Sequence, residues 1–251
     1  MKAMVLAAGL GTRLRPLTND RPKALVEING HTLLEITLAR FRTFGVHDVI
    51  VNVHHFADEM ESYLKANQNF GMHIEISRED ILLDTGGGLK KAAWFFLSDT
   101  GALEPFVLHN VDVLSNVDLN RMLEFHNQQN AVATLAIQDR KTSRYLLFDK
   151  AMQLSGRRSG GQQREEKLEM VRHADPVSAL AFSGIHIISP RLLPALTEDG
   201  VFSIINSYLR LAGQGERVLG FRADEYYWRD LGTPQSLAQA ALDLQNHALE
   251  G

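Results

Sequence analysis

A glycine-bearing loop near the N-terminus carries the residue types that hold phosphate groups. Gly9 and Gly11 lack a Cβ atom, so backbone N–H groups beside them can approach a bound group closely. Arg13 offers a planar pair of donors that matches two phosphate oxygens, and Lys23 adds a point charge ten residues later. Because the loop follows a short apolar run at 2–7, these residues predict a polyphosphate site at the end of a buried strand.

Two other phosphate-binding patterns are disfavoured. A dinucleotide-binding Gly-x-Gly-x-x-Gly loop would need glycine where Leu14 stands, and an acidic residue where the second predicted strand ends in Val53-His54-His55. The segment 86–90 reads Gly-Gly-Gly-Leu-Lys, which lacks the Gly-Lys-Ser/Thr order of a P-loop. The adjacent histidines His54 and His55 would face opposite ways on a strand, so a shared metal is not expected.

The elements that must position this loop alternate between strands and helices in the first half of the chain. Apolar runs predict strands at 2–7, 46–53, 73–77, 105–109 and 132–137. Helical spacing predicts helices at 32–44, 57–65, 85–97 and 119–127. Such alternation favours an α/β fold, a doubly wound and mostly parallel Rossmann-like sheet between two layers of helices.

The second half of the chain is less regular. We expect strands at 145–148, 179–188 and 218–221, and helices at 203–212 and 235–247. The segment 155–167 has no apolar residue, which predicts an exposed, mobile loop or the solvated tip of a hairpin. With no linker visible, the chain is interpreted as one domain, 1–251, with a regular half at about 1–137 and a less regular half at about 138–251.

Composition bounds the class of protein. The chain has 251 residues, of which 45% are hydrophobic and 22% charged, as in an ordinary globular protein. Its net charge of −4 disfavours general binding to nucleic acid or to an anionic membrane. The absence of cysteine excludes disulfides and thiolate sites, and no apolar run is long enough to span a bilayer. We therefore expect a cytoplasmic protein, either a monomer or a small homo-oligomer.

Five segments resemble the sugar-1-phosphate nucleotidylyltransferases. The N-terminal loop, Leu6-Ala-Ala-Gly-Leu-Gly-Thr-Arg-Leu-Arg-Pro-Leu-Thr18 followed by Pro22-Lys23, is similar to the family signature over about 20 residues. The other four are Leu83-Asp-Thr-Gly-Gly-Gly-Leu-Lys-Lys-Ala92, Phe106-Val-Leu-His-Asn-Val-Asp-Val113, Phe182-Ser-Gly-Ile185 and Trp228-Arg-Asp-Leu-Gly-Thr-Pro234. Together they span most of the chain, and the resemblance implies that the nucleotide-binding half is about 1–137 and the sugar-binding half about 138–251.

The resemblance implies a Mg²⁺ site and an activity. Asp112 and Asp230 match the family's metal carboxylates, and Mg²⁺ typically binds one or two carboxylates and completes its shell with water and phosphates. The reaction would join a nucleoside monophosphate from an NTP to a sugar 1-phosphate and release pyrophosphate. Arg13 would hold the leaving phosphates, and Lys23 would neutralise charge near the α-phosphate. The candidate catalytic residues are thus Arg13, Lys23, Asp112 and Asp230.

The same resemblance assigns binding residues. The nucleotide is expected to contact Leu6, Ala7, Ala8, Gly9, Gly11, Thr12, Arg13, Lys23, Thr85 and Gly86. The sugar is expected to contact Gly87, Asn110, Gly184 and Trp228. Gly86 and Gly87 are interpreted as leaving room for the base or the sugar at a helix N-terminus.

Departures from the family pattern concern the substrates. Val111 replaces the glycine that usually precedes the metal aspartate, and Asp84 replaces a glycine near the base. The chain resembles most the short bacterial enzymes that use UTP and N-acetylmuramate 1-phosphate. GTP with heptose or mannose 1-phosphate is the alternative, and the cytidylyltransferases acting on choline phosphate share the N-terminal loop.

The sequence disfavours two other function classes. A non-catalytic module that senses a sugar nucleotide could lose some of the four candidate catalytic residues, and all four are present. A glycosyltransferase on a similar fold typically holds its metal with Asp-x-Asp, but Asp112 is followed by Val113-Leu114. An enzyme of the nucleotidylyltransferase type is therefore the favoured prediction.

Overall fold

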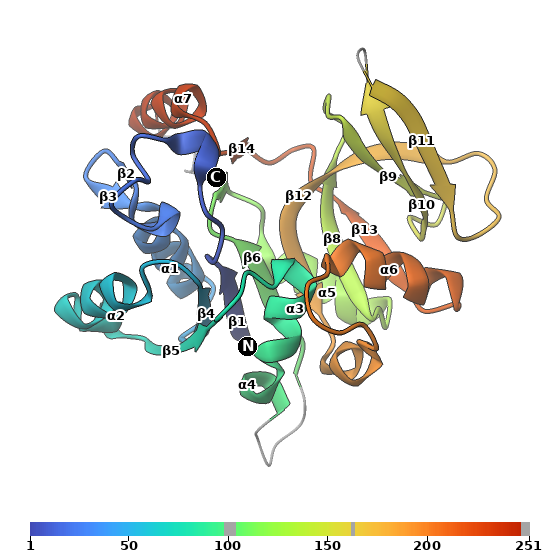
Figure 1. Cartoon of the computed structure of the whole chain (residues 1–251). Helices are drawn as coiled ribbons and strands as arrows, with labels where there is room; N and C mark the ends of the chain where they lie inside the picture. The colour runs from blue at the N-terminus through green and yellow to red at the C-terminus, as the bar shows by residue number, and fades with distance from the viewer. Residues whose placement is uncertain (98–103, 162–163, 247–251) are drawn as a thin grey trace.

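We analysed a computed structural model, which describes residues 1–97, 104–161 and 164–246 (Figure 1). The strands are β1 (Lys2–Leu6), β2 (Glu27–Ile28), β3 (His31–Thr32), β4 (Asp48–Val53), β5 (His73–Arg78), β6 (Phe106–Asn110), β7 (Val113–Ser115), β8 (Ala133–Gln138), β9 (Arg144–Phe148), β10 (Leu154–Gly161), β11 (Arg164–Met170), β12 (Ser178–Ile188), β13 (Val218–Arg222) and β14 (Trp228–Asp230). The α-helices are α1 (Leu33–Thr43), α2 (Ala57–Ala66), α3 (Asp84–Lys91), α4 (Ala93–Leu97), α5 (Leu119–Gln128), α6 (Ile204–Gly213) and α7 (Pro234–Gln245). The 3-10 helices are η1 (Thr12–Leu14), η2 (Lys23–Leu25), η3 (Gln68–Gly71) and η4 (Pro190–Ala195).

A ten-stranded mixed sheet forms the middle layer. Eight strands follow the order β11-β10-β9-β12-β6-β1-β4-β5, and β8 and β13 branch from β12. The strands β6, β1, β4 and β5 are parallel, as their helical connections require, whereas β12 runs antiparallel to β6, β8 and β9. The predicted α/β fold is confirmed, with its parallel part in the first half of the chain.

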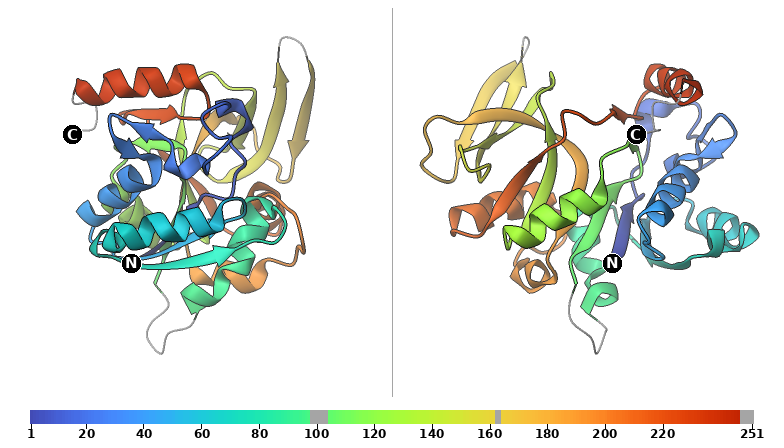
Figure 2. Two further views of the ribbon diagram at one scale, coloured as in Figure 1. Left: turned by 60° about the vertical axis from the view of Figure 1, so that its left-hand side comes forward. Right: turned by 180° about the vertical axis from the view of Figure 1, so that it is seen from behind.

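Each face of the sheet carries its own hydrophobic cluster, because successive side chains on a strand point to opposite faces. On β1, Ala3 and Val5 join the cluster that includes residues of α1, α2, α5 and α7, whereas Met4 joins the cluster beneath α3, α4 and α6. Helices therefore cover both faces of the sheet (Figures 1 and 2). This three-layer arrangement leaves the edge at the strand ends as the place for a site.

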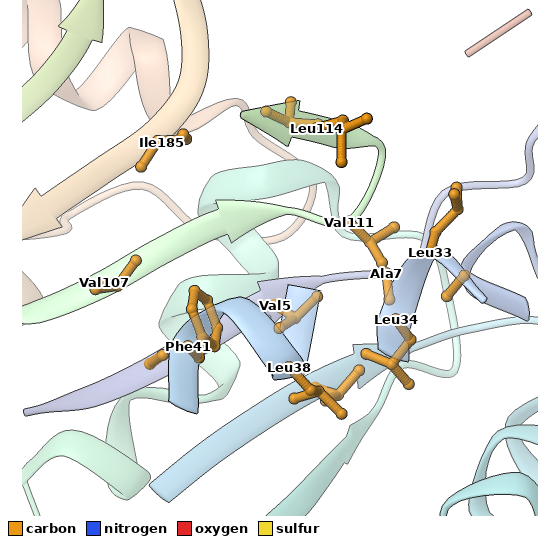
Figure 3. Close-up of a cluster of buried hydrophobic side chains, with 14 of the residues drawn as sticks. Val5, Ala7, Leu33, Leu34, Leu38, Phe41, Val107, Val111, Leu114 and Ile185 are labelled. Carbon is orange, nitrogen blue, oxygen red and sulfur yellow. The ribbon is translucent and has the colours of Figure 1, made fainter. Parts of the chain in front are cut away.

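Helix α1 shows how the sequence pattern makes a layer. Leu34, Leu38 and Phe41 recur at helical spacing and pack on Val5 and other residues of the sheet (Figure 3). The Thr32 side chain accepts a hydrogen bond from the Glu35 N–H at 3.1 Å and caps the first turn. The helix ends before Gly45, whose φ of 70° suits glycine.

Most predicted elements lie within a few residues of the observed ones, with three differences. The helix expected at 85–97 is broken at Ala92 into α3 and α4. The helix expected at 235–247 ends at Gln245 among the described residues. The short strand pairs β2–β3 and β7–β14 were not predicted, because two or three residues are too few to show a periodic pattern.

Of the two alternatives predicted for the segment 155–167, the hairpin is the one observed, and the described part of the segment forms its strands. It contributes to an antiparallel hairpin of β10 and β11, of which residues 162–163 lie outside the described chain. The hairpin needs few apolar side chains, because β10 also pairs with β9 and ion pairs join its own strands. Arg157 contacts Glu169 at 2.7 Å, and Arg158 contacts Glu166 at 3.3 Å.

The sheet takes strands from both predicted halves of the chain, since β12 lies between β6 and β9. Helix α7 closes back onto the N-terminal half, where the Asn29 side chain donates to the Ala241 carbonyl at 2.9 Å (Figure 2). The division at residue 137 stays a prediction. None of the helices in the described ranges has the length and hydrophobicity of a membrane-spanning segment.

Candidate active site

Three parallel strands deliver the site to one edge of the sheet. In register, Leu6 at the end of β1 lies beside Asn52 of β4 on one side and Asn110 of β6 on the other. The chain leaves β1 for β4 and later returns on the opposite side as β6, so β1 is the point at which strand order reverses. Open α/β sheets bind ligands outside the carboxyl ends of their strands at such a point.

The loop after β1 is held by glycine geometry and by hydrogen bonds. Gly11 has a φ of 61°, and a Cβ atom there would lie 2.9 Å from Thr18 Cγ2 and 3.1 Å from Lys23 Cβ. The Thr18 hydroxyl donates to the Gly11 carbonyl at 2.9 Å. By contrast, a Cβ atom at Gly9 would meet nothing within 4 Å. Gly11 therefore shapes the loop, while Gly9 leaves one side of it open.

A buried polar pair beneath the loop was not assigned by the sequence analysis. Asn52 accepts a hydrogen bond from the Ala7 N–H at 2.7 Å and donates to Glu79 Oε1 at 2.7 Å. Glu79 Oε2 accepts from the Leu83 N–H at 3.0 Å, just before α3. Both side chains are buried, so the bonds of Asn52 to Ala7 and to Glu79 are shielded from water. The pair ties the phosphate loop to the ends of β4 and β5 and to α3.

The two predicted metal aspartates lie side by side although they are more than 100 residues apart in sequence. Asp112 is the second residue after the end of β6, and the next three residues form β7. Strand β14 pairs with β7 so that Asp230 lies opposite Val113, and the Leu231 N–H donates to the Asp112 carbonyl at 2.8 Å. The short pair β7–β14 is therefore the element that brings the two carboxylates together.

Each aspartate is in contact with one of the two predicted catalytic cations. Lys23 donates from Nζ to Asp112 Oδ2, and their side chains are only 10% and 20% exposed. Arg13 Nη2 lies 3.9 Å from Asp230 Oδ1 and is largely exposed. Asp230 Oδ1 also accepts from the Gly232 N–H at 2.9 Å. The structure thus gathers the four predicted catalytic residues into a cluster of two ion pairs, Lys23 with Asp112 and Arg13 with Asp230.

A cavity of about 410 Å³ lies beside this cluster and carries more positive charge than the sequence analysis assigned. Lys23 lines it together with Arg15 and Arg21, and His55 forms part of its wall. The predicted residues Ala7 and Gly9 also line it. Arg15 and Arg21 had no predicted role, although their short spacing to Lys23 in the sequence was a usable signal.

The predicted sugar-side residues meet at a bulge in β12. The pairing of β12 with β8 shifts between Phe182 and His186. Within the bulge, Gly184 has a φ of 76°, and a Cβ atom there would lie 2.9 Å from Asn110 Nδ2. The Trp228 indole N–H donates to the Ser183 carbonyl at 2.7 Å. Asn110, Gly184 and Trp228 are thus brought to the same side of the aspartate pair.

The glycines at the start of α3 serve the chain's own packing, which differs from the expected reason for them. A Cβ atom on Gly86 would lie 2.3 Å from the Phe202 ring, and one on Gly87 would lie 2.4 Å from the Gly200 carbonyl oxygen. The Gly86 N–H donates to the Phe202 carbonyl at 2.9 Å, and Thr85 Oγ1 accepts from the Ile204 N–H at 3.0 Å. Gly200 and Phe202 fill the space that a Cβ atom would need, so the packing of the chain itself already requires glycine at both positions. Contact of Thr85, Gly86 or Gly87 with a substrate stays a prediction.

The histidines near the site do not behave as strand residues. Strand β4 ends at Val53, so the rings of His54 and His55 lie with centroids 4.5 Å apart instead of pointing to opposite faces. His54 Nδ1 is 2.8 Å from the Glu79 carbonyl oxygen. Within the described residues, no three histidine or acidic side chains gather as a possible metal cluster.

Comparison with known proteins assigns the chain to a protein family. The family model described as nucleotidyl transferase matches residues 2–151, which hold the phosphate loop, Lys23 and Asp112. The chain belongs to the nucleotidyl transferase family. It is an enzyme family, and the geometry of a cation-lined cavity beside two carboxylates agrees with nucleotidyl transfer.

Similar proteins extend the match over the whole chain. A Caulobacter vibrioides protein named N-acetylmuramate alpha-1-phosphate uridylyltransferase is 37% identical over 238 residues, 93% of each chain. A Mycobacterium tuberculosis mannose-1-phosphate guanylyltransferase is 27% identical over 96% of this chain and 64% of its own. Among solved structures, HddC from Yersinia pseudotuberculosis complexed with GMP-PN has a TM-score of 0.76 at 20% identity, covering 97% of this chain and 99% of that one. A UDP-glucose pyrophosphorylase complexed with UDP-glucose has a TM-score of 0.75 at 17% identity and covers 98% of each chain. These two likenesses show the fold.

Proposed function

We propose that this nucleotidyl transferase moves UMP from UTP to N-acetylmuramate 1-phosphate, giving the UDP-sugar and pyrophosphate. The observation that carries the reaction type is the Asp112–Asp230 pair beside a cavity lined by Arg15, Arg21 and Lys23. The choice of substrates rests on the Caulobacter relative, which matches almost the full length of both chains.

The aspartate pair fits a Mg²⁺ ion. Both side chains offer hard oxygen ligands, and each now contacts a cation, so the site already stabilises positive charge. The remaining ligands would come from water and from substrate phosphates, because Mg²⁺ usually takes only one or two carboxylates from the protein. When bound, the ion would neutralise charge on the phosphates that approach one another.

The reaction demands little acid–base chemistry from the chain. A phosphate monoester has a second pKa near about 6, so the sugar phosphate is mainly a dianion at neutral pH and needs no general base. Positioning and relief of charge repulsion are the main requirements. We propose that Arg13 and the cavity cations hold the triphosphate, and that Lys23 neutralises charge at the α-phosphate.

The loop and the bulge would divide the substrates between them. We propose that the nucleotide contacts the loop residues Leu6, Ala7, Ala8, Gly9, Gly11 and Thr12, with Thr85 and Gly86 near the base. The sugar would lie toward Gly87, Asn110, Gly184 and Trp228. Action in the cytoplasm as a monomer or small homo-oligomer, without nucleic acid or membrane, is also proposed.

A pyrophosphate-release assay tests this proposal. UTP, GTP, CTP and dTTP are each combined with N-acetylmuramate, heptose, mannose and glucose 1-phosphates and with choline phosphate, in the presence of Mg²⁺. We expect release with UTP and N-acetylmuramate 1-phosphate, and a loss of about 10²- to 10³-fold in kcat for Asp112→Asn, because one preorganised charge is removed. The matched control is Asp48→Asn, at the opposite end of β4, which should leave the rate unchanged.

The assay also separates the competing functions. Release with GTP and mannose or heptose 1-phosphate would favour the alternative that the Mycobacterium tuberculosis relative suggests. Saturable nucleotide binding with no release from any pair would contradict an enzyme and favour a module that senses sugar nucleotides.

A further inference from the structure

Arg140, which follows β8, holds an unusual position beside the aspartate pair. Its guanidinium carbon lies 3.5 Å from the centroid of the Trp228 ring, and its Nη2 donates to the Phe182 carbonyl at 2.7 Å. Its Nε atom is buried and has no hydrogen-bond partner. Among the residues that the structure describes, none places a carboxylate within ion-pair distance of Arg140.

A half-buried cation without a carboxylate partner carries a free-energy cost that an anion would relieve. Burial lowers the pKa of Arg140 below its ordinary value, against the opposing charge of Asp230. The neighbouring Ser183 is fully buried, and its hydroxyl has no hydrogen-bond partner either. The bulge beneath Arg140 thus leaves two polar groups unsatisfied at one place.

Strand β14 sets the direction from the aspartates to Arg140. Trp228 and Asp230 are two residues apart on this strand, so their side chains project from the same face. The Trp228 indole N–H is fixed to Ser183, and Arg140 covers one face of the ring. The Trp228 ring therefore holds the Arg140 guanidinium in place, on the side where Asn110 and Gly184 meet.

The other anions of the reaction already have cations to receive them. The triphosphate has Arg15, Arg21 and Lys23 in the cavity, and the sugar phosphate would meet the aspartate-bound ion. Arg140 lies outside both sets. An additional negative group, carried by the sugar itself, is the anion that this position lacks.

We propose that Arg140 binds a carboxylate on the sugar ring of the sugar 1-phosphate, and that it selects an acidic sugar over a neutral one. This inference rests on the proposed function and extends it, because it names the residue that recognises the lactyl carboxylate of N-acetylmuramate. Trp228 is a positioning residue for this contact. Charge-assisted pairing with a planar guanidinium supplies both affinity and orientation.

Calorimetric binding of sugar phosphates tests the proposal without requiring turnover. The probes are N-acetylmuramate 1-phosphate, its lactyl methyl ester, and N-acetylglucosamine 1-phosphate, which lacks the lactyl group. Wild-type protein should bind the acid about 10- to 100-fold more tightly than the ester or the neutral sugar. In Arg140→Gln, binding of the acid should fall to the level of the other two, while their binding and that of UTP stay unchanged.

Three further variants separate recognition from folding. Arg140→Lys should restore part of the preference, because it keeps the charge but not the fork. Trp228→Leu should selectively weaken the binding of N-acetylmuramate 1-phosphate. Arg172→Gln is the control, because it removes another partly buried arginine, which pairs with Asp149 at 3.2 Å and is far in sequence from Asp112 and Asp230. This variant should keep the preference for the acid. Thermal unfolding of each variant verifies that it is folded.

Specific outcomes would overturn the inference. If Arg140→Gln weakens the binding of the acid, the ester and the neutral sugar equally, then Arg140 contacts the 1-phosphate or only supports the fold. If wild-type protein binds the acid no better than the ester, no carboxylate is recognised. In either case, pyrophosphate release with a neutral sugar 1-phosphate would leave the family activity standing, and absence of release from every pair would contradict the proposed function separately.

Discussion

At the scale of single residues, Lys23 and Asp112 depend on each other. Both side chains are largely buried, and Lys23 donates to Asp112 from the beginning of η2. A pair removed from water in this way loses most when only one member is taken away, because the other charge is then left buried without a partner. Catalysis by this pair would therefore be tied to the stability of the loop that carries it.

A double-mutant cycle measures this dependence. Lys23→Met and Asp112→Asn should each lower the free energy of unfolding by about 1–3 kcal/mol. The double variant should lose less than the sum of the two, because it leaves no unpaired charge. Chemical denaturation supplies all three values. Strict additivity would show that the contact contributes no coupling energy.

At the scale of elements, the start of α3 packs against the segment that leads into α6. Gly86 and Gly87 let residues 200–202 lie directly on the helix, and Thr85 caps α6 by accepting from the Ile204 N–H. Two helices far apart in sequence are thereby joined on the same face of the sheet. The glycine-rich motif is read correctly only when its neighbour in space is known.

Alanine substitutions distinguish this packing from ligand contact. Gly86→Ala places a Cβ atom 2.3 Å from the Phe202 ring, so we expect a loss of about 1–3 kcal/mol in unfolding free energy. Gly9→Ala meets no atom within 4 Å and should change stability by less than about 0.5 kcal/mol. Because Gly9 lines the cavity, its substitution should instead raise the KM for the nucleotide. Equal Tm values for the two variants would contradict this division.

At the scale of the whole molecule, three buried histidines couple the fold to pH. Burial lowers the pKa of His109 and His126 to about 4 and that of His186 to about 3. His126 hydrogen-bonds Thr134 and Ser189, and His186 hydrogen-bonds Tyr208. All three are therefore neutral in the folded protein at neutral pH, and they lie in or beside the central sheet.

Stability should fall as the pH drops from about 6.5 toward 4. In this window the unfolded chain binds protons at these histidines and the folded chain does not, so each contributes a loss of up to about 1.4 kcal/mol per pH unit. Denaturation at pH 7.5, 6.0 and 5.0 measures the slope. His186→Gln should reduce it, whereas substitution of the exposed His173 should not. A slope unchanged by His186→Gln would refute the assignment.

Local patterns in the sequence predicted the loop after β1 and the alternation of strands and helices in the first half, whereas the four candidate catalytic residues came from the family resemblance. The first two properties are local. The glycines and cations of residues 9–23 stand close together along the chain, and each strand and helix shows its own periodicity. The fold class follows from the order of these elements, because parallel strands need helical connections.

The contacts between residues that are far apart in the sequence could be identified only from the folded structure. The pairing of β7 with β14 joins Asp112 to Asp230, Asn52 bonds Glu79 beneath the loop, and Arg140 rests on Trp228. None of these contacts leaves a periodic signal, because they depend on register and on one bulge in β12. For the polar hairpin of β10 and β11, the sequence predicted a solvated tip as one alternative but not the strands, since backbone pairing with β9 and cross-strand ion pairs replace the apolar alternation from which a strand is predicted.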